Sequence, residues 1–388
     1  IGAWREPKLA ELNRKAFISA VDAVINEKVD FVLISGDLFN TSLPSFDSLK
    51  ETVAKLKQLA DLSIPVYIIA GSHDFSPSGK TMLDVLEHAG LCINVARGED
   101  AGGKLRLKIT VDQKTGAKIT GMIGKKGMLE KEFYELLDRE NLENEDGFKI
   151  FMLHTALTEL KPAEMEKMDS APISLLPKGF DYYAAGHVHV QDIKSFPDYK
   201  NVVYPGPLFP NNFAELEKGM GSFCIYEDGK IELKTLYLAK TFLLEIDCEA
   251  KTPDKVNSEI EETIKGKDFT DTIILMRLSG KLSSGRPSDI GFKNLITKMN
   301  EQGAYFVMKN TSKLTAPEFE EVQIQTSNID EIEEKIIQEN LGQFRIDKVE
   351  KETILSIMNL LNKEKDEGET NRDFEERVRR DIDEHLEL

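Results

Sequence analysis

The chain has 388 residues, of which 40% are hydrophobic and 30% are charged, and its formal net charge is −18 at pH 7. This length and apolar content suit a globular protein of two or three domains. No run of eighteen apolar residues occurs, the start has no signal-peptide pattern, and the three cysteines are scattered. We therefore expect a soluble protein of a reducing, intracellular compartment with no membrane attachment.

The charge is distributed unevenly along the chain. Residues 327–388 contain 10 basic and 19 acidic side chains, a balance of −9, whereas residues 265–313 contain 9 basic and 4 acidic ones, a balance of +5. An acidic chain is unfavourable for binding DNA, because phosphates attract positive charge. The local basic stretch is therefore the part of the chain that suits a nucleic-acid partner.

The first third of the chain alternates helical and strand patterns. The expected helices are 11–28, 44–61 and 82–86, and the expected strands are 30–35 and 65–70. Pro44 stands at a first helical position after Ser42. This alternation predicts a sheet covered on both faces. The apolar stripe of the second helix faces either the protein's own core or a second copy of the chain; its residues are Phe46, Leu49, Val53, Leu56 and Leu59.

The middle of the chain is rich in predicted strands and turns. We expect a hairpin at 105–123, a helix at 129–137, a strand at 148–153, a strand before Gly186, a rigid turn at 202–207 and a hairpin at 223–236. The pattern changes near residue 240, where strands and helices again alternate to about residue 308. This change predicts a separate small α+β domain.

Polar side chains follow four of these strands. They are Asp37; Ser72, His73 and Asp74; His154; and His187 with His189. Alternation along a strand predicts that His187 and His189 point to the same side. Carboxyl ends of strands are where α/β enzymes place their chemistry, and imidazoles with a bridging carboxylate suit two close cations such as Mn²⁺, Fe²⁺ or Zn²⁺. The pattern therefore indicates a two-metal phosphoester site.

Four short motifs in this order carry a family resemblance: Gly-Asp-Leu-Phe at 36–39, Gly-Ser-His-Asp at 71–74, the strand-end His154, and Gly-His-Val-His at 186–189. The chain resembles the calcineurin-like metallophosphoesterases, and among them the SbcD-type nucleases of the meiotic recombination eleven family of double-strand-break repair. The resemblance implies an α/β fold, an α+β sandwich, with a small capping domain and C-terminal helices. It also implies a homodimer formed by the helices that follow the second and third motifs.

The resemblance also implies roles for these residues. Asp37 would bridge two divalent metals, most suitably Mn²⁺, with His154 and His187 on one metal and His189 on the other. His73 would be the general acid that protonates the leaving oxygen, with Asp74 orienting it.

Two positions depart from the family pattern. Ser72 stands where the family usually has Asn, so this candidate ligand would bind metal more weakly. Asn40 stands where some relatives carry His. The family's first motif, Asp-x-His before Ile or Leu and Gly, would end at Ile1-Gly2, so we expect the metal ligands of that motif to be missing from this sequence.

The basic stretch lies in the predicted capping domain. Its candidate DNA-binding residues are Lys281, Arg286 and Lys293. In the loop 283–286, small residues would let backbone N–H groups approach a phosphate, although an ordinary solvated loop fits the same residues equally well.

The charged tail contains two thin amphipathic patterns that cannot form a core alone. The apolar positions expected to bind a partner are Ile354, Met358, Phe374, Val378 and Ile382. By the resemblance the partner is the coiled coil of an SMC-like ATPase, and docking on the chain's own catalytic domain is the alternative.

These observations combine into one functional hypothesis. Residues 1–240 would be a two-metal nuclease domain, 241–325 a DNA-binding capping domain, and 326–388 a linker with partner-binding helices. The protein would cleave DNA phosphodiesters in double-strand-break repair, in the cytoplasm at the nucleoid. The alternatives are a phosphoesterase acting on small nucleotides or phosphoproteins, and a nuclease-silent scaffold that tethers DNA.

Overall fold

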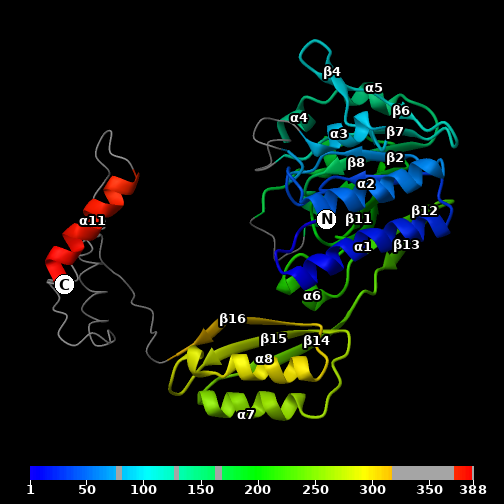
Figure 1. Ribbon diagram of the computed structural model, residues 1–388. Coiled ribbons are helices and arrows are strands. Elements are labelled where there is room, and N and C mark those ends of the chain that lie inside the picture. Colours follow the sequence, from blue (N-terminus) through cyan, green and yellow to red (C-terminus); the bar gives the residue numbers. More distant parts are fainter. Residues whose placement is uncertain (76–80, 126–130, 162–167, 317–370, 387–388) are drawn as a thin grey trace. The chain divides into compact units, whose positions relative to one another are not determined.

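The computed structural model describes residues 1–75, 81–125, 131–161, 168–316 and 371–386 (Figure 1). The chain divides into two compact units, residues 1–317 and 318–388. In the second unit the described residues form the helix α11 (Asn371–Leu386). No helix within the described ranges is long and apolar enough to cross a membrane.

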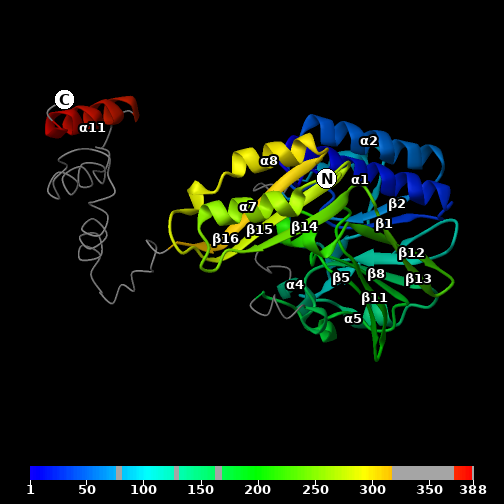
Figure 2. The ribbon, with the colours of Figure 1, turned by 90° about the horizontal axis from the view of Figure 1, so that it is seen from below.

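The N-terminal part of unit 1 consists of helices packed on a small parallel sheet. This sheet has the order β1-β2-β3, with β1 at Val32–Ser35, β2 at Val66–Ile69 and β3 at Ile93–Asn94. The helices are α1 (Pro7–Asn26), α2 (Phe46–Asp61) and α3 (Met82–His88), and α1 and α2 lie side by side (Figure 2). Their apolar faces share one core with β1 and β2.

Local sequence signals explain where these helices begin. The side chain of Ser45 caps α2 by accepting a hydrogen bond from the Ser48 N–H group at 3.2 Å, so Pro44 precedes the cap and is not the first helical residue as predicted. Helix α3 begins with a capping box formed by Thr81 and Asp84. On α2, Leu56 and Leu59 are buried in the protein's own core, whereas Phe46 is exposed.

The second sheet is six-stranded, with the order β10-β11-β9-β8-β7-β6. Its strands are β6 (Thr110–Val111), β7 (Lys118–Gly121), β8 (Lys149–His154), β9 (Tyr182–Gly186), β10 (Gln191–Phe196) and β11 (Tyr199–Pro205). Apolar side chains of β8 and β9 pack against Tyr67 and Ile69 of β2, so the two sheets lie face to face. This arrangement confirms the predicted α/β sandwich.

Smaller elements surround the second sheet. They are β4 (Gly98–Asp100), β5 (Leu105–Leu107), α4 (Lys131–Glu135), α5 (Arg139–Glu143), η2 (Thr158–Leu160), η4 (Ile173–Leu175), α6 (Phe213–Lys218), β12 (Ser222–Glu227) and β13 (Lys230–Thr235). The hairpin predicted at 105–123 is only partly right. Strands β6 and β7 pair around its turn, but β5 pairs with β4 instead.

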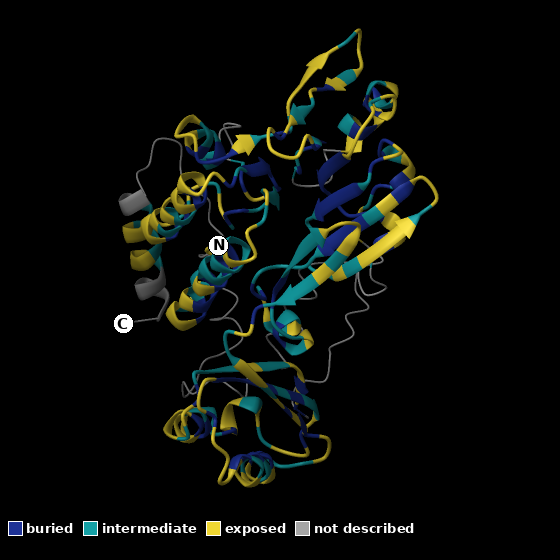
Figure 3. Cartoon of the chain, turned by 90° about the vertical axis from the view of Figure 1, so that its right-hand side faces the viewer, coloured by how far each residue is buried: buried dark blue, intermediate teal, exposed yellow. Residues whose placement is uncertain are grey.

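A third sheet carries the predicted capping region. It has the order β14-β15-β16 and is entirely parallel, with β14 at Lys240–Asp247, β15 at Thr272–Lys281 and β16 at Phe306–Thr315. Helices α7 (Pro253–Ile264) and α8 (Phe292–Glu301) cover one face, with the short η5 (Pro287–Asp289) before α8. Figure 3 shows their exposed residues on the outward side.

The other face of this third sheet packs against the rest of unit 1. Ile273 and Leu275 of β15 share a core with Leu9 and Leu12 of α1 and Leu216 of α6. The predicted boundary near residue 240 thus coincides with the start of β14, while residues 1–317 remain one compact unit.

Candidate metal centre

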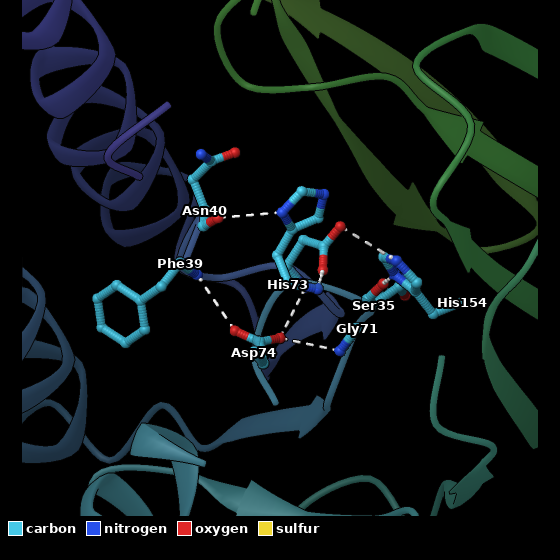
Figure 4. Close-up of polar contacts among 8 residues, drawn as sticks. Ser35, Phe39, Asn40, Gly71, His73, Asp74 and His154 are labelled. Carbon is cyan, nitrogen blue, oxygen red and sulfur yellow. Dashed lines mark hydrogen bonds and ion pairs between the residues drawn. The ribbon is translucent and has the colours of Figure 1, made fainter. Parts of the chain in front are cut away.

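The strand-end residues singled out in the sequence meet at one edge of the two sheets. Asp37 follows β1, His73 follows β2, and His154 ends β8 (Figure 4). They border a cavity of about 980 Å³, which His187 and His189 also line. The fold therefore gathers residues from four strands, as the sequence predicted.

Asp37 sits in a sharp turn in which both Gly36 (φ 88°) and Asp37 itself (φ 52°) are left-handed. Its Oδ1 accepts a hydrogen bond from the His73 backbone N–H at 2.8 Å. Its Oδ2 lies 3.2 Å from Nε2 of His154. Burial acts to raise the pKa of Asp37, but His154 and the His73 N–H outweigh it and hold the pKa at about 2. The carboxylate is therefore charged and directed at the imidazole.

His154 is 1% exposed, and its Nδ1 hydrogen-bonds to the Ser35 carbonyl oxygen at 2.7 Å. A carbonyl oxygen can only accept, so Nδ1 carries the proton and, in a neutral ring, Nε2 carries the lone pair. The buried Nε2 has no hydrogen-bond partner in the described structure, and it faces a carboxylate oxygen. Burial lowers the pKa of His154, but Asp37 raises it more. A positive charge between the two atoms stabilises this contact, and either a proton on Nε2 or a bound cation would supply it.

Four glycines enclose the ring of His154. A Cβ atom at Gly36, Gly71, Gly124 or Gly186 would lie 2.2, 2.6, 2.3 or 2.9 Å, respectively, from an atom of that imidazole. Contacts under about 3 Å are closer than carbon atoms pack in proteins. Only glycine at these strand ends leaves space for the ring, so the backbone itself forms the cradle.

Asp74 stabilises the loops and does not orient His73 as predicted. It is 1% exposed, and its carboxylate accepts backbone N–H groups of Asp37 (2.9 Å), Phe39 (3.3 Å) and Gly71 (2.8 Å). Burial raises the pKa of Asp74. The contacts described for Asp74 include none to the His73 ring, because its oxygens point at the turns that follow β1 and β2 (Figure 4).

His73 is instead oriented by a backbone group. Its Nδ1 lies 3.0 Å from the carbonyl oxygen of Asn40, and the side chain is exposed at the cavity. Nδ1 must donate to a carbonyl oxygen, which leaves Nε2 for the cavity side. Ser72, the neighbouring candidate ligand, is 6% exposed on the same turn.

His187 and His189 lie beyond the end of β9, so the alternation predicted for them does not apply. His187 has φ 88°, and its ring packs edge-on against that of His154 with centroids 5.1 Å apart. Burial and His154 lower the pKa of His187 to about 4, so its ring is neutral. His189 turns to Glu215 of α6, whose Oε1 lies 2.9 Å from its Nδ1.

The side chains gathered at this edge are suited in part to binding a divalent cation. The carboxylate of Asp37, the imidazole of His154 and the neutral ring of His187 are ligands of the type that first-row metals bind. As placed, no three His, Cys, Asp or Glu side chains in the described ranges lie close enough to share one ion. Metal binding would therefore require these side chains to come closer together than they are placed here.

The comparison with protein families agrees with this geometry. A model of the calcineurin-like phosphoesterases matches residues 10–191, which hold every strand-end residue of the site. These residues belong to the calcineurin-like phosphoesterase family. The resemblance seen in the sequence is thereby confirmed, and members of this family use divalent metals.

Relatives of this phosphoesterase include proteins named for DNA repair. The DNA double-strand break repair protein Mre11 of Archaeoglobus fulgidus is 28% identical over 378 residues, which cover 94% of this chain and 79% of that protein. Mre11 of Sulfurisphaera tokodaii is 33% identical over 180 residues, covering 46% of this chain and 43% of that protein. An uncharacterized metallophosphoesterase of Bacillus subtilis, YhaO, is 26% identical over 207 residues, covering 52% and 47%.

Some backbone groups of the predicted DNA-binding loop already have hydrogen-bond partners within the chain. The N–H groups of Ser283 and Arg286 already donate to the Lys251 carbonyl and to Asp289, at 2.9 and 2.7 Å. The N–H of Lys281 donates to Glu249 at 2.8 Å. These three N–H groups are therefore already engaged, and phosphate contact at this loop stays a prediction that rests on the N–H groups of Ser284 and Gly285 and on side chains. Lys293 is exposed on α8.

The predicted partner-binding residues lie in unit 2. Phe374, Val378 and Ile382 fall on α11, where Phe374 and Val378 are half-buried and the Arg377 guanidinium lies over the Phe374 ring. Ile354 and Met358 lie outside the described residues.

Sequence reasoning missed Glu215, which contacts a site histidine. The spacing of Asn212 and Glu215 is a helix-start signal, and the Asn212 side chain does accept the Glu215 N–H at 2.9 Å. That signal could have predicted α6, but no local pattern connects it with His189.

Proposed function

We propose that this protein is a divalent-metal-dependent DNA nuclease that hydrolyses phosphodiester bonds in double-strand-break repair. The observation that carries this proposal is the convergence of a carboxylate and imidazoles at one cavity, where Asp37 Oδ2 and His154 Nε2 lie 3.2 Å apart and His187 and His189 also line the wall. The similarity to Mre11 across 94% of the chain supports DNA as the substrate and double-strand breaks as the context. Action on DNA would place the protein at the nucleoid.

The residues proposed to hold metal are those already gathered at the strand ends. Asp37, His154 and His187 would serve one Mn²⁺, and Asp37 with His189 would serve a second, with Ser72 as a weaker ligand. When bound, the cations would activate a water molecule and neutralise the attacked phosphate.

His73 has the position of a proton donor. Its Nδ1–H is held by the Asn40 carbonyl and the residue lines the cavity, so the doubly protonated ring could transfer its Nε2 proton to the leaving oxygen and return to the neutral form. Asp74 would act at a distance, by holding the turn that carries His73.

The remaining parts would supply partners. Side chains of Lys281 at the end of β15, Arg286 in the following loop and Lys293 on α8 would contact DNA phosphates, since all three lie in the basic stretch. Exposed apolar residues of α2 would pair two copies into a homodimer, and α11 would bind the coiled coil of an SMC-like ATPase.

The proposal is tested with end-labelled DNA and Mn²⁺. The protein is assayed as residues 1–388 and, separately, with any residues that precede Ile1 in its natural chain. We expect at least one of these two forms to cleave the DNA, and the substitution Asp37→Asn should abolish that cleavage. His88→Gln is the matched control, because His88 is an exposed histidine on α3 whose hydrogen bond in the described part of the chain is to Asp84 of the same helix; it should cleave normally.

Other outcomes would contradict the proposal. Hydrolysis of nucleotides or a phosphopeptide, with DNA left intact, would indicate a phosphoesterase of another substrate class. DNA binding with no hydrolysis in either form of the protein would indicate a tethering scaffold.

A further inference from the structure

Helix α6 connects the candidate metal centre with the third sheet. Its Leu216 is 0% exposed and shares a core with Leu9 of α1 and Ile273 of β15. The two glutamates that flank Leu216 extend their side chains to different neighbours. Glu215 reaches His189, and Glu217 reaches Arg277 of β15.

The carboxylate of Glu215 is held by more than one group. Its Oε1 lies 2.9 Å from His189 Nδ1 and 2.6 Å from Asn212 Nδ2, while Oε2 accepts the Asn211 N–H at 2.8 Å. A carboxylate fixed in this way accepts a proton-bearing Nδ1 and directs the lone pair of the ring to Nε2. His189 also lines the cavity.

Glu217 makes a two-pronged ion pair with Arg277. The Nε atom of Arg277 donates to Oε1 at 2.8 Å and Nη2 donates to Oε2, while the guanidinium lies 5.2 Å from the centre of the Phe213 ring. The side chains of Arg277 and Glu217 are only 23% and 18% exposed. Fork-shaped pairs of this kind fix direction as well as distance.

We propose that Glu215 is a positioning residue for His189, and that the Glu217–Arg277 pair anchors α6, and with it this imidazole, to the third sheet. A shift of the third sheet would then move α6 and change the ring direction of His189. This inference rests on the proposed function only in so far as His189 serves a metal or a phosphate. The hydrogen-bond arrangement itself is independent of that function.

The first test measures the tautomer of His189 by NMR of histidine-labelled protein without added metal. The wild type should show the proton on Nδ1. Glu215→Ala should yield a mixture of tautomers or the Nε2–H form, and Glu215→Gln should restore Nδ1–H, because the amide oxygen still accepts. An unchanged His189 signal in Glu215→Ala would overturn the proposal.

The second test addresses the anchor. Arg277→Met should mix the His189 tautomers, and Mn²⁺ affinity should fall by about 10–100-fold in Glu215→Ala, as for loss of an outer-shell partner. Arg97→Met is the matched control, since it removes another Arg–Glu pair, Arg97–Glu87, that lies away from α6. If Arg277→Met leaves the His189 signal like that of Arg97→Met, the anchor is refuted.

These tests separate the inference from the proposed function. If the protein did not cleave DNA at all, the expected tautomer of His189 and its dependence on Glu215 would be unaffected. Conversely, a nuclease whose His189 tautomer ignores Glu215 would retain the function and refute the positioning role.

Discussion

The Nδ1–H of His154 donates to the Ser35 carbonyl oxygen at 2.7 Å, and this single bond joins the end of β8 in one sheet to the end of β1 in the other. Because it fixes the ring tautomer, it also decides that Nε2 is the atom facing Asp37. Packing of the two sheets and the chemistry of the site therefore depend on the same contact.

The glycine cradle should tolerate no side chain at Gly186. A Cβ there would lie 2.1 Å from the Ser35 oxygen and 2.9 Å from His154 Nδ1, so Gly186→Ala must push the two sheets apart. We expect a loss of about 1–3 kcal/mol in the free energy of unfolding, measured by urea denaturation. Gly291→Ala is the control, since its nearest contacts would be an ordinary 3.8 Å. Equal stability of the two variants would show that the cradle is not tight.

The proposed homodimer should depend on the exposed start of α2. Leu43 and Phe46 are 78% and 91% exposed, whereas Leu56 is 1% exposed and packs inside its own chain. Phe46→Glu should therefore convert a dimer into a folded monomer, measured by light scattering, while Leu62→Glu at the other end of α2 should not. A monomeric wild type, or a dimeric Phe46→Glu protein, would refute this interface.

The tail should bind a partner and leave the stability of the rest unchanged. Residues 318–388 form a unit separate from residues 1–317. A chain ending at Pro317 should keep the melting temperature of the full chain within about 2 °C and lose binding to the SMC-like ATPase in a pull-down. A large fall in melting temperature would instead assign the tail to the core of the catalytic domain.

The loss of folding stability at acid pH should depend in part on Asp112. Its carboxylate is 2% exposed and accepts hydrogen bonds from Tyr67 and from the turn residues Lys114 and Thr115. Burial raises the pKa of Asp112, but these bonds outweigh it and lower the pKa below that of an unfolded aspartate. The stabilisation is present above the unfolded pKa and is lost as the pH falls through the folded pKa.

The corresponding variant is Asp112→Asn. At pH 7 it should cost about 1–3 kcal/mol of unfolding free energy, and the difference from wild type should shrink below about pH 4. Asp100→Asn, which changes an exposed carboxylate at the end of β4, is the control. A difference from wild type that stayed constant from pH 7 to pH 3 would disprove the link.

Much of the fold could be predicted because its signals are local. Apolar runs followed by a glycine and a polar residue gave the ends of β1, β2 and β9, and the same glycines form the cradle of His154. The placement of His187 and His189 could not be predicted in this way. Strand β9 ends at Gly186 and His187 is left-handed, so the alternation of side chains along the strand ends before it reaches either histidine.

Contacts between residues that are far apart in the sequence could not be predicted either. The family resemblance implied that Asp74 orients the His73 ring, yet its carboxylate bonds to turns after two different strands. Glu215 reaches His189 from a six-residue helix whose position depends on a shared core with β15. Such contacts follow from how sheets and helices pack, and adjacency in the sequence does not indicate them.

The central claim is that Asp37, His154 and His187 bind a divalent cation, and titration of residues 1–388 with Mn²⁺, followed by electron paramagnetic resonance of the free ion, tests it most directly. We predict at least one bound Mn²⁺ in the wild type and in the His88→Gln control. Asp37→Asn and His187→Gln should each weaken binding by about 100-fold or more, since losing a ligand costs more than losing an outer-shell partner. Equal Mn²⁺ affinity in all four proteins would contradict the account.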